Sequence, residues 1–236
     1  MKLNILQIKA FTLAEVLITI GIIGVVAALT LPSIIANNKA KALEAGLKKG
    51  ASTINQALLH YQADSGEPVK ADGTLKAGEL SSMIKQYFNI AYDCGYAYNS
   101  SIATGCVSNV GDNDSDKSSK AYQTLNGKSN ISLNFFDDAQ FILTDGSMIF
   151  FENGNVSTRT YISVDVNGYK KGPNKLGEDL FMFQLNSGGI LVPMGAKGTD
   201  YYSENDEYCS QTSTSNMNGA GCTAKALSDP KYFTNL

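Results

Sequence analysis

Residues 11–35 have the sequence FTLAEVLITIGIIGVVAALTLPSII, in which Glu15 is the only ionisable side chain. As an α-helix at about 1.5 Å per residue this stretch is about 37 Å long, enough to cross a hydrocarbon core of about 30 Å with some tilt. About fourteen Leu, Ile, Val and Phe side chains favour insertion by roughly 4 to 8 kcal/mol together, against a cost of about 3 kcal/mol for one acid. We therefore predict a membrane-spanning helix over 11–35.

The ten residues before this stretch, MKLNILQIKA, carry basic side chains at Lys2 and Lys9. Positive charge ahead of a membrane helix keeps that end in the cytoplasm, so the C-terminal domain is expected outside it. A removable secretory signal is the alternative, but the apolar run exceeds the usual length of about 7 to 15 residues and no small-residue cleavage site follows promptly. We expect a single-pass protein of the cytoplasmic (inner) membrane.

An acid inside an apolar helix indicates a functional site that needs a partner. Residues 9–32, KAFTLAEVLITIGIIGVVAALTLP, resemble the prepilin cleavage and methylation motif of the type IV pilin and type II secretion pseudopilin superfamily. The resemblance implies cleavage between Ala10 and Phe11 by a prepilin peptidase, N-methylation of Phe11, a role for Glu15 in assembly and a helix-bending role for Pro32. The family favours Gly just before the cut, where this chain has Ala10.

The resemblance also implies a filament subunit, placed in a periplasmic or cell-surface filament. The partners implied are copies of the chain, other pilin-like subunits, the peptidase, an inner-membrane assembly platform and the lipid bilayer. In a filament the apolar helices exclude water, so the new amino group of Phe11 can neutralise Glu15 of an adjacent subunit and set the axial register. The alternative is that Glu15 merely reaches the lipid headgroups.

Beyond Pro32 the helix is expected to continue over 36–64, where apolar side chains recur at three- and four-residue steps up to the turn-rich 65–68. A shorter helix is predicted over 77–92. Strand-like segments follow, and Asp145-Gly146 is typical of a hairpin turn. These segments are AQFILT, SMIFFE, TRTYISVDV, FMFQLN and ILVPMG.

The predicted fold class is therefore α+β and pilin-like. A long N-terminal helix, half membrane-spanning and half amphipathic, packs on an antiparallel sheet of four or five strands. The predicted organisation has a cleaved basic leader, a transmembrane and assembly helix, an amphipathic continuation and a globular domain, which span 1–10, 11–35, 36–64 and 65–236.

The four cysteines form two close pairs in polar segments and no CxxC is present. A structural zinc site needs tighter spacing, and the only histidine, His60, is remote in sequence. We predict two local disulfides and hence an oxidising compartment, with free buried thiols as the alternative. The cysteines are Cys94, Cys106, Cys209 and Cys222.

A possible calcium site is expected at Asp165, Asn167 and Asp179, because calcium prefers carboxylate and carbonyl oxygens. The spacing does not match a helix-loop-helix calcium loop. Some pseudopilins carry a calcium in a C-terminal loop, which supports the expectation by resemblance, and a solvated Asn-Gly turn is the alternative. A second candidate cation loop lies in 112–116, where Asp112, Asp114 and Asp116 alternate.

The composition is 43% hydrophobic and 17% charged, and the net charge is -3, which argues against a nucleic-acid partner. With one histidine and no phosphate-binding glycine loop, we do not expect an enzyme. The leading hypothesis is a structural subunit of a type II secretion-like pseudopilus or a type IV pilus, with the pseudopilus favoured because nothing in the domain indicates a receptor site. The alternative is a membrane-anchored, extracytoplasmic binding module that does not polymerise.

Overall fold

The structure is a computed structural model that describes residues 12–96, 105–107, 121–154 and 158–236. It divides into two compact units, Met1–Ala40 and Lys41–Leu236, which are described separately. Helix α1 (Leu13–Ser65) contributes to both units. The predicted leader, the predicted cleavage site at Ala10 and Phe11, and the candidate cation loop at 112–116 lie outside the described residues.

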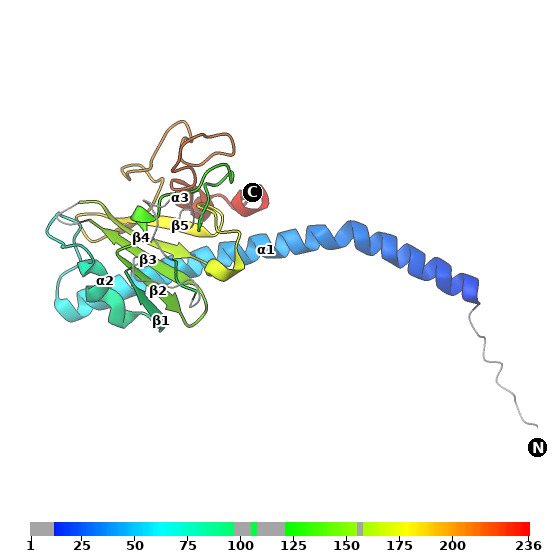
Figure 1. Cartoon of the computed structure of the whole chain (residues 1–236), viewed down its shortest axis with the longest axis horizontal. Coiled ribbons are helices and arrows are strands. Elements are labelled where there is room, and N and C mark those ends of the chain that lie inside the picture. Colours follow the sequence, from blue (N-terminus) through cyan, green and yellow to red (C-terminus); the bar gives the residue numbers. More distant parts are fainter. Residues whose placement is uncertain (1–11, 97–104, 108–120, 155–157) are drawn as a thin grey trace, which may run out of the picture. The chain divides into compact units, whose positions relative to one another are not determined.

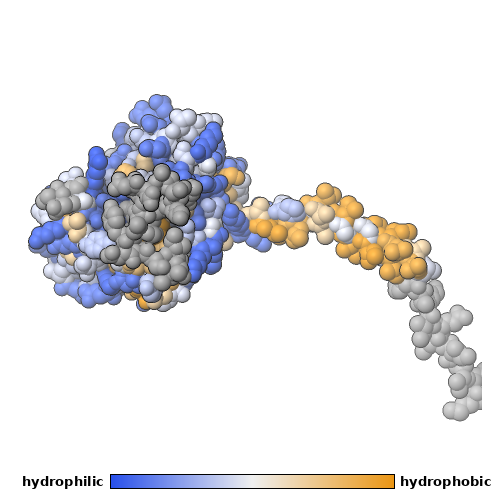
Figure 2. Space-filling view, in the orientation of Figure 1, coloured by the Kyte–Doolittle hydropathy of each residue, from blue (hydrophilic) through white to orange (hydrophobic). Residues whose placement is uncertain are grey.

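The first unit is the apolar, N-terminal part of α1. It is long and apolar enough to cross a membrane, which confirms the predicted membrane-length helix. Every residue from Thr12 to Lys39 is exposed, and Figure 2 shows this part of the helix as predominantly hydrophobic. Pro32 lies inside α1 without ending it, although its ring removes one backbone hydrogen bond.

The second unit contains a six-stranded antiparallel sheet in which each strand pairs with the next along the chain (Figure 1). Short turns join three of the neighbouring pairs, as antiparallel pairing allows, whereas longer connections, residues 96–138 and 166–179, follow the first and the fourth strands. The strands are β1 (Ile90–Gly95), β2 (Ala139–Leu143), β3 (Met148–Asn153), β4 (Thr160–Asp165), β5 (Leu180–Leu185) and β6 (Leu191–Pro193).

The predicted count of four or five strands was wrong, because β1 adds a sixth. The prediction had placed its first residues in a helix over 77–92, but that helix is shorter: α2 (Glu79–Ile84) and the 3₁₀ turn η1 (Lys85–Tyr87) precede β1. The middle of β1 is exposed, so it lacks the apolar run that marked the other strands. Its pairing with β2 defines it as a strand.

One face of the sheet packs on α1 within the second unit. Leu47 and Ile54 are fully buried, as the predicted stripe requires. The helix closely approaches β4 and the residue after it at two glycines. A Cβ on Gly50 would lie 2.9 Å from Cγ2 of Val164 in β4, and one on Gly46 would lie 2.9 Å from Cβ of Val166. The helix ends at Ser65, one residue beyond the predicted end, and Gly66 follows with a φ of 82°, the left-handed conformation that commonly closes helices.

The other face of the sheet is covered by loops, short helices and a second apolar cluster. Phe150, Met182 and Tyr122 belong to this cluster. Because both faces are covered, β4 is buried along its whole length. The short helices on this side are η4 (Leu133–Phe135), η5 (Tyr169–Lys171) and α3 (Cys222–Ser228). The last short helix, η6 (Tyr232–Thr234), instead packs Phe233 on Phe181, which is paired with the α1-facing Val164.

Both predicted disulfides are present. Cys94 is bonded to Cys106 and Cys209 to Cys222, and the described residues include no free cysteine. Each bridge closes a short loop, which stabilises a domain chiefly by restricting its unfolded chain.

Candidate functional site

The acid predicted to act in assembly lies in the first turn of α1. The backbone N–H and the hydroxyl of Thr12 both donate hydrogen bonds to Oε2 of Glu15, at 2.8 Å each. The N–H of Glu15 donates in return to Oγ1 of Thr12 at 3.2 Å. This reciprocal pair is a capping box, which satisfies donors that the first turn of a helix leaves unpaired.

The capping box gives Glu15 a local partner while its side chain stays exposed. The positive end of the helix dipole also favours a carboxylate at this place. Sequence analysis missed the role of Thr12, although the T-x-x-E spacing at 12–15 is a recognised signal for such a cap. The arrangement holds one carboxylate at the start of an otherwise uncharged surface.

That surface is made of exposed, large apolar side chains on all sides of the first unit. Their exposed fractions range from 43% for Val16 to 77% for Leu13. Apolar area of this extent is unfavourable in water at about 25 cal/mol per Å², so lipid or other apolar helices must cover it. The side chains are Leu13, Val16, Leu17, Ile18, Ile20, Ile22, Ile23, Val25, Val26, Leu29, Leu31, Ile34 and Ile35.

Of the expected calcium ligands, Asp165 is the last residue of β4 and Asp179 directly precedes β5, and both are fully buried. Oδ1 of Asp165 accepts the N–H groups of Asn167 at 3.1 Å and Gly168 at 2.8 Å. Its Oδ2 accepts the hydroxyl of Tyr122 at 2.6 Å. The two carboxylates therefore organise the loop through hydrogen bonds.

Asp179 acts in the same way on residues that precede it in the chain. Its two oxygens accept the N–H groups of Asn174 at 2.8 Å and Lys175 at 2.7 Å. Burial, with a further contribution from the negative charge of Asp179, raises the pKa of Asp165 to about 7. Burial also raises the pKa of Asp179.

The carboxylate oxygens of Asp165 and Asp179 do not fit a calcium site. Every carboxylate oxygen of the pair already faces an N–H or O–H group, whereas calcium needs about six to eight free oxygen ligands. The side-chain oxygens of Asn167 and Asn174 are buried without a partner, but the amide nitrogen of Asn167 is held by the carbonyl of Gly172 at 2.7 Å. The arrangement fits a clamp of the β4–β5 loop better than a cation site.

A calcium titration tests this interpretation. Millimolar Ca²⁺ should leave the melting temperature of the full chain unchanged, and so should a chelator. A cation present at a concentration of about one hundred times its Kd would add about 2.7 kcal/mol to the free energy of unfolding. A rise of several degrees that Asp179→Asn abolishes would restore the calcium expectation.

A second acidic group forms where β2 begins and β3 ends. Carboxylate oxygens of Asp137, Asp138 and Glu152 lie within 4.8 Å of one another. Asp137 and Asp138 directly precede β2 and Glu152 lies in β3, so no local sequence pattern links the three acids. Its burial, followed by the charge of Asp138, raises the pKa of Glu152 to about 9.

This shift predicts a pH dependence of stability. Because the pKa of Glu152 rises from 4.5 to about 9 on folding, its contribution is complete below the unfolded value and is lost as the pH rises towards 9. Glu152→Gln should therefore stabilise the domain at pH 8 by about 1 kcal/mol, allowing for solvent screening of a partly exposed group. The test is the melting temperature measured by thermal unfolding between pH 7 and 9. This range lies above the pKa of Asp165, which is about 7. Glu67→Gln, at an exposed acid, is the control, and an unchanged slope in Glu152→Gln would refute the assignment.

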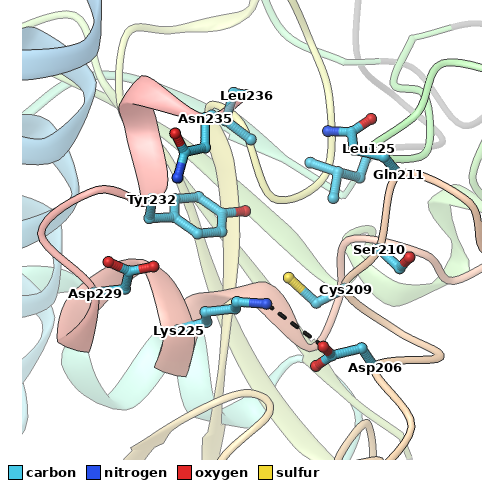
Figure 3. Close-up of a pocket in the computed structure, with 10 residues that line it drawn as sticks. All are labelled: Leu125, Asp206, Cys209, Ser210, Gln211, Lys225, Asp229, Tyr232, Asn235 and Leu236. Atoms are coloured by element: carbon cyan, nitrogen blue, oxygen red, sulfur yellow. Dashed lines mark ion pairs between the residues drawn. The ribbon is translucent and has the colours of Figure 1, made fainter.

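The C-terminal region contains a hollow of about 370 Å³ (Figure 3). Lys225 and Asp206 form an ion pair of 3.5 Å on its lining. The hydroxyl of Tyr232 donates to the carbonyl of Gly177 at 2.5 Å, so this group is used inside the fold. Cys209, part of the second disulfide, lines the same hollow. The polar groups of this hollow thus mainly hold the C-terminal segment in place.

Comparisons with family models, curated proteins and solved structures give no match to this chain.

His60, the one histidine, is exposed near the end of α1 and stacks on Tyr87 with ring centroids 6.1 Å apart. Of the described features, the first turn of α1 and the apolar surface behind it have the most direct functional implication.

Proposed function

We propose that this chain is a structural subunit of a type II secretion-like pseudopilus or a type IV pilus, processed by a prepilin peptidase and assembled through its N-terminal helix. The observation that supports this most is the combination, on one helix, of an exposed apolar surface and a single acid in its first turn. A simple anchor requires the first feature and has no use for the second.

Lipid tails can cover the apolar surface of one copy, but they offer neither a hydrogen-bond donor nor a cation to a carboxylate. When helices pack on each other, the headgroups and water around Glu15 are displaced, and an unpaired charge there costs several kcal/mol. A free amino group at Phe11 of a neighbouring copy supplies the missing cation once the leader is removed. Glu15 then exchanges its bonds from Thr12 for a charged partner, and the pairing fixes how far one subunit is displaced along the next.

The rest of the chain is consistent with this proposal. Two disulfides stabilise the second unit, which suits an extracytoplasmic location. The basic residues Lys2 and Lys9 ahead of the apolar stretch favour a cytoplasmic N-terminus. The alternative is an anchored extracytoplasmic binding module that remains single.

Co-expression with a prepilin peptidase distinguishes the two functions. A filament subunit should lose residues 1–10, with a new N-terminus at Phe11 detected by mass spectrometry. Ala10→Gly should be cut at least as fast, because the recognised motif favours glycine there, and Ala10→Leu should stay uncut. A chain that keeps Met1–Ala10 in the presence of an active peptidase would support the anchored module.

A further inference from the structure

One end of the sheet is tied to the part of α1 that enters the second unit. Val166, just after β4, lies against Gly46 of the helix. The turn between β2 and β3 meets the same helix, where Nζ of Lys49 lies 2.7 Å from Oδ2 of Asp145. Figure 1 shows η5 as a short yellow helix at this end of the sheet. This end of the domain, which contains η5, therefore contacts residues of α1 that follow the apolar segment closely in the sequence.

The length of chain limits how far this end can be from a membrane. Gly46 lies eleven positions after Ile35, the last residue of the apolar stretch, and eleven helical steps span about 16 Å. The headgroup layer itself occupies about 5 to 8 Å beyond the hydrocarbon on each side. Surface charges act over about 8 to 10 Å at physiological salt. A link of this length therefore allows side chains at this end to reach the electrostatic range of the bilayer surface.

The same end carries exposed lysines that form no ion pair with the acids that the structure describes. Lys41, Lys170 and Lys171 are exposed, and within the described part of the chain none of them is in an ion pair. The nearby acids are already used, because Glu44 pairs with Lys48 and Asp145 with Lys49. We call Lys41, Lys170 and Lys171 the basic rim.

Two of the rim lysines border a hollow of about 240 Å³ between η5 and the β2–β3 turn. Ile142, Met148 and Tyr169 give it an apolar lining. Lys170 bends over it, since its Nζ would lie 3.6 Å from a Cβ on Gly105. Apolar walls hold the alkyl part of a lysine and direct the ammonium outward, so this is a suitable place for a compact anionic group.

We propose that the basic rim and this hollow dock the soluble domain on anionic phospholipid, with a headgroup phosphate between Lys170 and Lys171. The proposal rests only on membrane anchoring and stands whether or not the chain is processed or polymerises. Its consequence is that each copy has a preferred orientation on an anionic bilayer, and that this contact must break when the domain leaves the membrane surface.

Lysine reactivity in nanodiscs tests the proposal on the full chain. Nanodiscs of neutral phosphatidylcholine are compared with nanodiscs in which one third is phosphatidylglycerol, and the acetylation rate of each lysine is measured by mass spectrometry. Lys170 and Lys171 should react about five times more slowly on the anionic bilayer, as expected for about 1 kcal/mol of attraction per lysine. High salt should remove the protection.

Lys76 is the matched control, because its carbonyl accepts the side-chain amide of Asn153 at the opposite end of β3 and its own side chain is exposed. Its reactivity should not depend on the lipid. In the double variant Lys170→Gln and Lys171→Gln, protection at Lys41 should weaken, whereas Lys76→Gln should have no effect. Free glycerol phosphate added to neutral nanodiscs should not protect the rim. Equal rates on both bilayers, or equal protection of Lys76, would overturn the proposal.

Discussion

Chains with Glu15→Gln should be processed normally but should be lost almost completely from filaments. The substitution removes the negative partner and leaves an ammonium group unpaired among apolar helices, at a cost of about 3 to 5 kcal/mol per contact. Such a cost corresponds to a fall of about a hundredfold or more in incorporation. The measurement is the amount of the variant in sheared and pelleted filaments relative to the amount in the membrane.

Glu44→Gln is the matched control for this experiment. Glu44 lies on the same helix but forms an i,i+4 pair with Lys48 at the surface, where an ion pair contributes little. Its loss should leave incorporation unchanged. Efficient incorporation of Glu15→Gln, or equal loss of both variants, would argue against the intersubunit role of Glu15.

The second large effect is expected on stability, at the clamp of the β4–β5 loop. Asp165→Ala removes the acceptor of three buried donors: the hydroxyl of Tyr122 and the N–H groups of Asn167 and Gly168. At about 1 to 3 kcal/mol for each unsatisfied buried group, the free energy of unfolding should fall by about 3 kcal/mol or more. For a chain of this length, thermal unfolding should show a fall in melting temperature of about 6 to 12 °C.

Asp165→Asn separates hydrogen bonding from charge in this prediction. Asparagine keeps an oxygen that accepts the two N–H groups, and it removes the negative charge that is repelled by the negative charge of Asp179. It should therefore be close to wild type, and more stable than wild type above pH 7. Asp72→Ala, at an exposed aspartate with a similar turn bond to the N–H of Thr74, should leave the melting temperature nearly unchanged. An Asn variant as unstable as the Ala variant would contradict the clamp.

The features that could be predicted from the sequence are those that depend on patterns among neighbouring residues. The membrane-length helix follows from an apolar run interrupted only by Glu15, and the buried stripe of Leu47 and Ile54 follows from helical periodicity. The disulfides follow from two short cysteine spacings. In each case a few neighbouring residues carry the whole signal.

The parts that could not be predicted depend on contacts between distant residues. β1 is a strand because β2 offers it a partner, and its own exposed middle carries little pattern. The bond from Tyr122 to Asp165 spans 43 positions, and Glu152 meets Asp137 only through the pairing of β2 with β3. Only the tertiary structure brings these residues together, so no spacing in the local sequence could predict the contacts.

The most direct test of the account is a distance between chains in the assembled filament. Filaments are made from a mixture of chains labelled with ¹⁵N in phenylalanine and chains labelled with ¹³C in glutamate, so that any contact between the two labels joins different copies. Solid-state NMR should find the amino nitrogen of Phe11 within about 4 Å of the carboxylate of Glu15, the range of an ion pair. Filaments that form without this contact would contradict the proposed role of Glu15.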